Sequence, residues 1–177
     1  MDIKMTVKNT KPHFDDIDID NILSDIRVSL ETCQLTFGSK LEEFENQFSE
    51  YVGTSGAVAV NSGTSALEIP LRYFGVEGGE VIVPTNTFVA TANAVIFAGG
   101  KPIFADMDSE NLCMDFEDVK KKINEKTKGI IIVHMAGLIP PYMHELKDLC
   151  EEKNIFLIED AAHAHGSKID GLAAGSI

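Results

Sequence analysis

Ionisable side chains follow the last apolar run of the chain, residues 155–158. Glu159 and Asp160 come directly after this run, and His163 and His165 lie a few residues further on. Because an unpaired carboxylate at the mouth of a buried strand is costly, Asp160 should have a cationic partner or cap a following helix. A protonated pyridine nitrogen would be such a partner, since the charged ring then accepts electrons from a bound substrate.

A second motif, residues 61–66 (Asn-Ser-Gly-Thr-Ser-Ala), is typical of a turn that begins a helix. Gly63 lets the backbone approach a ligand closely, and Thr64 and Ser65 offer hydroxyl groups. The unpaired N–H groups of a helix start suit a phosphate, although an ordinary helix cap is the alternative interpretation. Together with Asp160, the motif predicts a ligand with a phosphate at one end and a cationic ring nitrogen at the other, as in pyridoxal phosphate.

The same histidines and carboxylates could instead bind a metal ion. His134, which ends a neighbouring apolar run, is the only further ligand expected nearby. The spacing of these residues matches no recognised metal-binding motif, and we expect no metal site.

The elements that must position these residues alternate along the chain. Helical patterns separate five apolar runs that are rich in β-branched residues: 57–60, 81–83, 102–104, 130–133 and 155–158. This alternation predicts an α/β fold, a three-layer α/β/α arrangement with a mostly parallel sheet covered on both faces. Ligands bind beyond the carboxyl ends of such strands. Phe88 follows one of these ends and could stack on a flat ring, although a lone phenylalanine is more often part of a core.

Residues 1–52 are predicted to be a helical lead-in. An acidic run between Asp15 and Asp20 favours a helix start, and apolar residues at helical spacing between Leu41 and Val52 predict an amphipathic helix that ends before Gly53.

Composition limits the partners and the compartment. The chain has 177 residues and a formal net charge of −13, which argues against nucleic acid and anionic membranes as partners. Its three cysteines are far apart and odd in number, a usage typical of a reducing compartment. We see neither a signal peptide nor an apolar run of about 18 residues, and we therefore expect a cytoplasmic protein.

Four motifs in a fixed order resemble the DegT/DnrJ/StrS-type sugar aminotransferases, a family of fold-type-I enzymes that depend on pyridoxal phosphate and act mostly on nucleotide-linked keto sugars. The motifs lie at residues 57–67, 84–91, 104–108 and 159–166, and a further landmark, Phe37-Gly38 with Phe44-Glu45, precedes them. The resemblance implies that Gly63, Thr64 and Ser65 hold the cofactor phosphate. It also implies that Phe88 stacks on the pyridine ring and that Asp160 pairs with the ring nitrogen.

The resemblance further implies that His163 lies beside the phenolic oxygen of the cofactor, as the candidate catalytic residue. In the family, the lysine that binds the cofactor lies beyond the Asp160 motif, after a segment that begins where this chain ends. Lys168 is too early in the sequence to match it. Residues 53–177 would then be a partial large domain without the C-terminal small domain, and the chain alone would be inactive.

The reaction implied is amino transfer, from glutamate as the usual donor, to a keto sugar linked to a nucleotide. A homodimer is implied for the full-length protein. Two alternatives stay open at this point: a sugar dehydratase of the same lineage, which also uses pyridoxal phosphate, and a non-catalytic truncated fragment.

Overall fold

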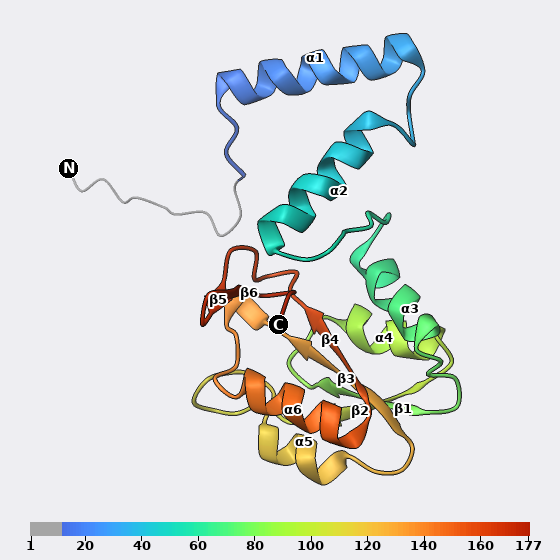
Figure 1. Ribbon diagram of the computed structural model, residues 1–177, viewed down its shortest axis with the longest axis vertical. Coiled ribbons are helices and arrows are strands. Elements are labelled where there is room, and N and C mark those ends of the chain that lie inside the picture. Colours follow the sequence, from blue (N-terminus) through green and yellow to red (C-terminus); the bar gives the residue numbers. More distant parts are fainter. Residues whose placement is uncertain (1–11) are drawn as a thin grey trace, which may run out of the picture. The chain divides into compact units, whose positions relative to one another are not determined.

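Two helices, α1 (Asp16–Thr32) and α2 (Ser39–Val52), begin the computed structural model, which describes residues 12–177 (Figure 1). The acidic run does favour a helix start, because the Asp15 carboxylate accepts the N–H of Asp18 as an N-cap. None of the helices within residues 12–177 is long and apolar enough to cross a membrane.

The chain divides into two compact units after Glu43, inside α2, whereas the sequence suggested a division after residue 52. The second half of α2 belongs to the second unit and contacts later segments of it. The Glu45 carboxylate accepts the N–H of Ala59 at 2.8 Å, and the Phe48 ring lies edge-on to the His165 ring with centroids 5.7 Å apart. The role of residues 1–52 as a lead-in stays a prediction.

A four-stranded parallel sheet forms the centre of the second unit, in the order β2-β1-β3-β4 (Figure 1). Its strands are β1 (Glu80–Pro84), β2 (Lys101–Ala105), β3 (Thr127–Val133) and β4 (Phe156–Asp160). Each corresponds to one of the predicted apolar runs. The chain order reverses direction between β1 and β3, which is the place where open α/β sheets bind ligands.

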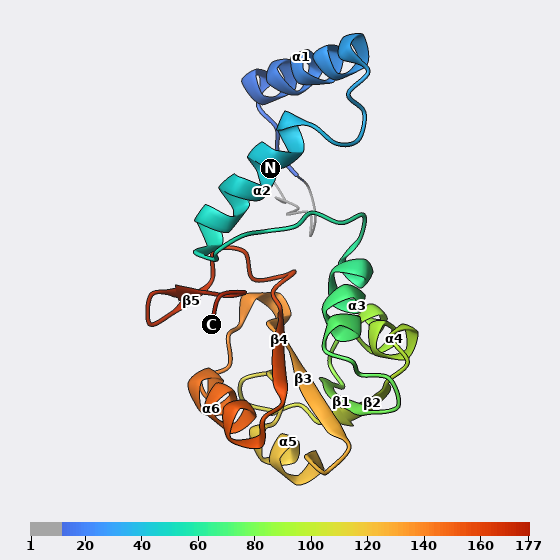
Figure 2. The ribbon, with the colours of Figure 1, turned by 45° about the vertical axis from the view of Figure 1, so that its right-hand side comes forward.

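Helices cover both faces of the sheet, so the predicted three-layer α/β/α arrangement is confirmed (Figure 2). One face carries α3 (Gly63–Tyr73) and α4 (Val89–Phe97), and the other carries α5 (Phe116–Lys122) and α6 (Met143–Lys153).

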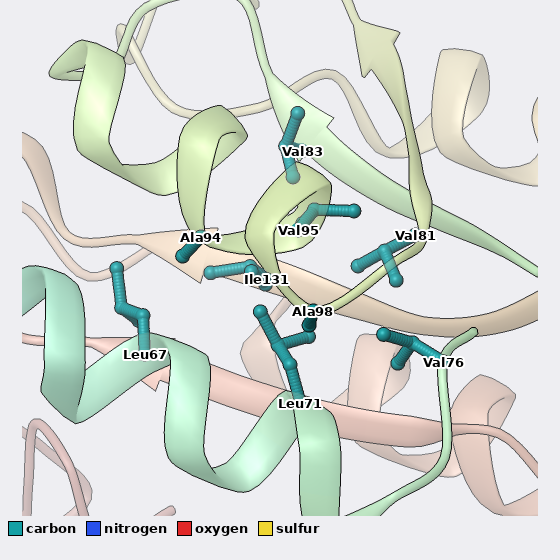
Figure 3. Packing of buried hydrophobic residues seen from close by; sticks show 9 residues of the cluster. All are labelled: Leu67, Leu71, Val76, Val81, Val83, Ala94, Val95, Ala98 and Ile131. Atoms are coloured by element: carbon teal, nitrogen blue, oxygen red, sulfur yellow. The ribbon is translucent and has the colours of Figure 1, made fainter.

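Each face of the sheet has its own core, because successive strand residues point to opposite sides. Val81, Val83 and Ile131 pack with α3 and α4 (Figure 3). Ile82 and Ile130 pack with α5 and α6. All five side chains are fully buried. These two cores fix the strands whose carboxyl ends carry the candidate site.

The remaining short elements follow β3 and β4. A 3₁₀ helix, η1 (Met135–Gly137), comes directly after β3. After β4 the chain turns back through an antiparallel hairpin of β5 (Lys168–Ile169) and β6 (Leu172–Ala173). Asp170 and Gly171 connect these strands with φ values of 50° and 85°, and an aspartate–glycine pair tolerates that conformation well.

The apolar run at residues 57–60 is not a strand, so that prediction was wrong. Val58 is 83% exposed, and the backbone N–H of Ala59 is taken by the Glu45 side chain instead of a neighbouring strand. The run alternates alanine with valine, and its alanines can bury little apolar surface. Within residues 12–177 the segment therefore has neither a ladder partner nor enough burial to stabilise a strand.

Candidate functional site

A cavity of about 240 Å³ lies where β1, β3 and β4 end. It is lined by residues that follow these strands and by the first turns of α3 and α4. The structure brings together five of the six residues that the sequence singled out: Gly63, Thr64, Phe88, Asp160 and His163.

The start of α3 presents free donors to this cavity. Ser62 is the N-cap and accepts the N–H of Ser65 at 3.2 Å, whereas the N–H groups of Gly63 and Thr64 have no acceptor among the described residues. A Cβ placed on Gly63 would meet no atom within 4 Å, so a ligand has open access to this backbone. Two free N–H groups at the positive end of a helix suit a phosphate.

Ser65 is placed differently from Gly63 and Thr64. Its hydroxyl donates to Asn61 Oδ1 at 2.8 Å and lies 3.1 Å from the Ser62 hydroxyl, and Ser65 does not line the cavity. Through these hydrogen bonds the Ser65 side chain stabilises the turn before α3. A phosphate contact from Ser65 stays a prediction.

Asp160 lines the same cavity from the end of β4, with part of its side chain buried. Oδ1 accepts the N–H of Ala162 at 3.2 Å, and Oδ2 accepts the hydroxyl of Thr91 at 3.4 Å. No lysine, arginine or histidine among the described residues forms an ion pair with it. A carboxylate in this situation fits a cationic N–H group of a ligand.

His163 also lines the cavity, and its contact with η1 fixes the position of the ring hydrogen. Nδ1 lies 3.4 Å from the N–H of Ala136, which can only donate. Nδ1 therefore accepts, and the neutral ring carries its hydrogen on Nε2. The solvent-exposed imidazole can then donate from Nε2 to an oxygen of a ligand.

Phe88 is the N-cap residue of α4, and its ring lines the cavity although it is 74% exposed. A large aromatic ring left this open at the mouth of a cavity contributes little to the core. It is available to stack on a planar ligand.

Replacing Phe88 with alanine should weaken the binding of a planar phosphorylated ligand, with pyridoxamine phosphate as the test compound, by roughly 2- to 10-fold, because a ring–ring contact contributes about 0.5–1.5 kcal/mol. The stability of the fold should be unaffected, since the ring is mostly exposed. Fluorescence titration and urea unfolding would measure the two effects. Phe97→Ala, which removes a half-exposed ring from the far end of α4, is the control and should leave binding unchanged.

A second, larger cavity of about 380 Å³ lies beside the open edge of β4. It shares Gly63 and Asp160 with the first but is lined by neither Phe88 nor His163. The second cavity has its own aromatic and imidazole side chains, Phe48, Tyr51 and His165, but it is not lined by Thr64. Of these two cavities, only the first brings the N–H groups of Gly63 and Thr64 together with Asp160, and it is therefore the candidate site.

Glu159 points to the opposite face of the sheet from Asp160 and forms a buried hydrogen-bonding centre. One carboxylate oxygen lies 2.9 Å from Nε2 of the fully buried His134 and accepts the N–H of Gly175, and the other accepts the N–H of Ile177. Burial raises the pKa of Glu159, but these hydrogen bonds outweigh burial and hold it below the ordinary value of 4.5. This centre ties the last residues of the chain to the ends of β3 and β4.

The metal interpretation finds no support in this arrangement. Within the part of the chain that the structure describes, no group of three or more histidine, cysteine, aspartate or glutamate side chains is placed to hold a metal ion. His134 and Glu159 bind each other, whereas His165 packs against Phe48.

Two residues of the site were missed by sequence reasoning. Thr87 and Thr91 both line the cavity, and their hydroxyl oxygens are 2.8 Å apart. Thr91 is a polar residue in the almost wholly apolar helix α4, one turn after Thr87. Thr87 lies just before the N-cap Phe88 and Thr91 in the first turn of α4, so the two hydroxyls meet at the start of this helix.

The fold is that of an α/β domain with a cavity at the carboxyl ends of its parallel strands. The chain belongs to the DegT/DnrJ/EryC1/StrS aminotransferase family, whose model matches residues 16–177.

Individual relatives agree with this assignment. The chain is 40% identical over 140 residues to GDP-perosamine synthase from Vibrio cholerae, covering 78% of this chain and 38% of that protein. The X-ray structure of the aminotransferase from Psychrobacter cryohalolentis matches with 33% identity and a TM-score of 0.85, covering 93% of this chain and 41% of that one. NtdA from Bacillus subtilis, solved with bound cofactor PMP, matches with 33% identity and a TM-score of 0.80, covering 90% and 35%. The chain therefore spans less than half the length of these relatives.

Proposed function

We propose that this chain is part of a sugar aminotransferase that uses pyridoxal phosphate and transfers an amino group from glutamate to the keto group of a nucleotide-linked sugar. One observation carries the proposal: the same cavity is lined by two N–H groups, of Gly63 and Thr64, that have no acceptor within residues 12–177, and by the Asp160 carboxylate, which has no ion-pair partner there. The family membership and the Vibrio cholerae relative, which is named for a GDP-linked sugar, support the choice of substrate.

Each end of the cavity would hold one group of the cofactor. The N–H groups of Gly63 and Thr64 would bind the phosphate, aided by the positive end of α3. The Asp160 carboxylate would hold a proton on the ring nitrogen, and the Phe88 ring would cover one face of the pyridine. His163 would donate its Nε2 hydrogen to the phenolic oxygen, which makes it the candidate catalytic residue. When bound, the cofactor withdraws electrons from a substrate carbon and carries the amino group between donor and acceptor.

We further propose that this chain alone holds the cofactor without a covalent bond and is not an active transaminase. The described residues that line the cavity include no lysine, and Lys168 belongs to the β5–β6 hairpin.

The metal-free site, the cytoplasmic location and the homodimer of the full-length protein also remain proposals. Exposed apolar side chains on α1, such as Ile17 and Leu23, support pairing with a second copy.

Titration of the purified chain with pyridoxamine phosphate tests the proposal, because this amine form of the cofactor cannot condense with stray lysines. We expect saturable binding of one molecule per chain, with inorganic phosphate competing for the site. In a parallel sample treated with pyridoxal phosphate and then borohydride, peptide mass spectrometry should find no lysine that is labelled in preference to the others. An absence of pyridoxamine phosphate binding would contradict the proposal.

A further inference from the structure

The Thr91 hydroxyl has hydrogen-bond partners that are unusual for a threonine in a helix. The residue is only 1% exposed and lies in α4 among the buried apolar residues Ala92, Ala94 and Val95. A threonine inside a helix usually donates to a backbone carbonyl three or four residues earlier. Thr91 instead directs its hydroxyl away from the helix backbone, to Oδ2 of Asp160 at 3.4 Å and to the Thr87 hydroxyl at 2.8 Å.

The chemistry of these groups fixes the direction of both hydrogen bonds. An ionised carboxylate can only accept, so Thr91 donates its one hydrogen to Asp160. The Thr91 oxygen is then left with lone pairs only, and Thr87 donates to it. The Thr91 hydrogen therefore points to the carboxylate, and the Thr87 hydrogen points to the Thr91 oxygen. The outer hydrogen bond, from Thr87 to Thr91, strengthens the inner one, from Thr91 to Asp160.

The contacts of Asp160 show what this arrangement achieves. The Ala162 N–H binds Oδ1 and the Thr91 hydroxyl binds Oδ2, so both oxygens are held in place from two different elements. Each oxygen keeps further lone pairs for a ligand. Without the hydroxyl, the carboxylate would be held on one side only and could rotate about its Cβ–Cγ bond.

We propose that Thr91, supported by Thr87, is a positioning residue that orients the Asp160 carboxylate toward the ring nitrogen of the cofactor. This inference rests on the proposed function. The inference gives a role to a buried hydroxyl that packing alone would not require, since valine has a β-branched side chain of similar shape.

Thr91→Val and Thr91→Ser separate the hydroxyl from the shape of the side chain. Thr91→Val should weaken pyridoxamine phosphate binding by roughly 3- to 10-fold, whereas Thr91→Ser should stay within about 2-fold of the original chain. The absorbance of bound pyridoxamine phosphate should also report the protonation of its ring nitrogen. In Thr91→Val this nitrogen should lose its proton at a lower pH than in the original chain. Thr127→Val, which alters another buried threonine far from the cavity, is the control and should change stability alone.

A double-mutant cycle distinguishes positioning from a merely structural effect. With Asp160→Asn already present, Thr91→Val should weaken binding by less than about 2-fold, because the hydroxyl acts only through the carboxylate. Equal affinities and equal pH profiles for the Val and Ser variants would overturn the inference, as would full additivity with Asp160→Asn. If Thr91→Val does not fold, Thr87→Val removes the outer donor and should weaken binding in the same direction.

The same measurements distinguish a failure of the proposed function from a failure of the inference about Thr91. Failure of the unaltered chain to bind pyridoxamine phosphate overturns the proposed function and, with it, the role of Thr91. Binding by the unaltered chain that Thr91→Val leaves unchanged overturns only the inference about Thr91.

Discussion

Replacing Asp160 with asparagine is expected to weaken pyridoxamine phosphate binding by roughly 10- to 100-fold. A hydrogen bond to a charged partner contributes about 1.5–3 kcal/mol, and the amide keeps the shape of the side chain while removing its charge. Fluorescence titration of the purified chain measures the change. The free energy of unfolding should stay within about 0.5 kcal/mol, because the carboxylate has no ion-pair partner among the described residues to lose.

Asp148→Asn provides a matched control for this charge change. Asp148 is exposed on α6, on the opposite face of the sheet from α3 and α4, and its replacement should leave affinity unchanged. Equal affinities for Asp160→Asn and the original chain would show that the carboxylate does not touch the ligand.

Replacing Glu159 with alanine should destabilise the fold by about 3–5 kcal/mol, as expected when one partner of a buried polar pair is removed. The change leaves the buried His134 ring without its one hydrogen-bond partner among the described residues and frees the N–H groups of Gly175 and Ile177. Urea unfolding followed by circular dichroism measures the loss. Glu151→Ala, at an exposed position of α6, should change stability by less than about 0.5 kcal/mol.

The stability that Glu159 provides should depend on pH. Its pKa is lower in the folded chain than the ordinary value of 4.5, so its contribution is fully present above that pH. The contribution disappears as the pH falls through the lower folded value. The difference between the original chain and Glu159→Ala should therefore be constant near neutral pH and shrink in acid. A difference that grows in acid would contradict this assignment.

The fold could be predicted where local pattern and burial agree. Val81–Val83 and 130–133 are continuous apolar runs, and both became central strands that are buried on two faces. The run at 57–60 has the same pattern, but its small side chains found no neighbouring strand in the described residues. A strand depends on a neighbouring strand that is often distant in sequence, and the local pattern does not reveal that neighbour.

The candidate site was predictable to the extent that its residues stand at element ends. Gly63, Phe88 and Asp160 each lie next to the end of an apolar run or the start of a helix, and the topology of a parallel sheet brings such positions together. Thr91 and the pairing of His134 with Glu159 depend on side-chain distances across elements. Those distances arise only once the helices have packed.

A crystal structure of this chain grown with pyridoxamine phosphate tests the central claim most directly. We expect phosphate oxygens within about 3.2 Å of the N–H groups of Gly63 and Thr64, and the ring nitrogen within the same distance of the Asp160 carboxylate. A ligand whose phosphate lies away from the start of α3, or whose ring nitrogen faces any group other than Asp160, would contradict it.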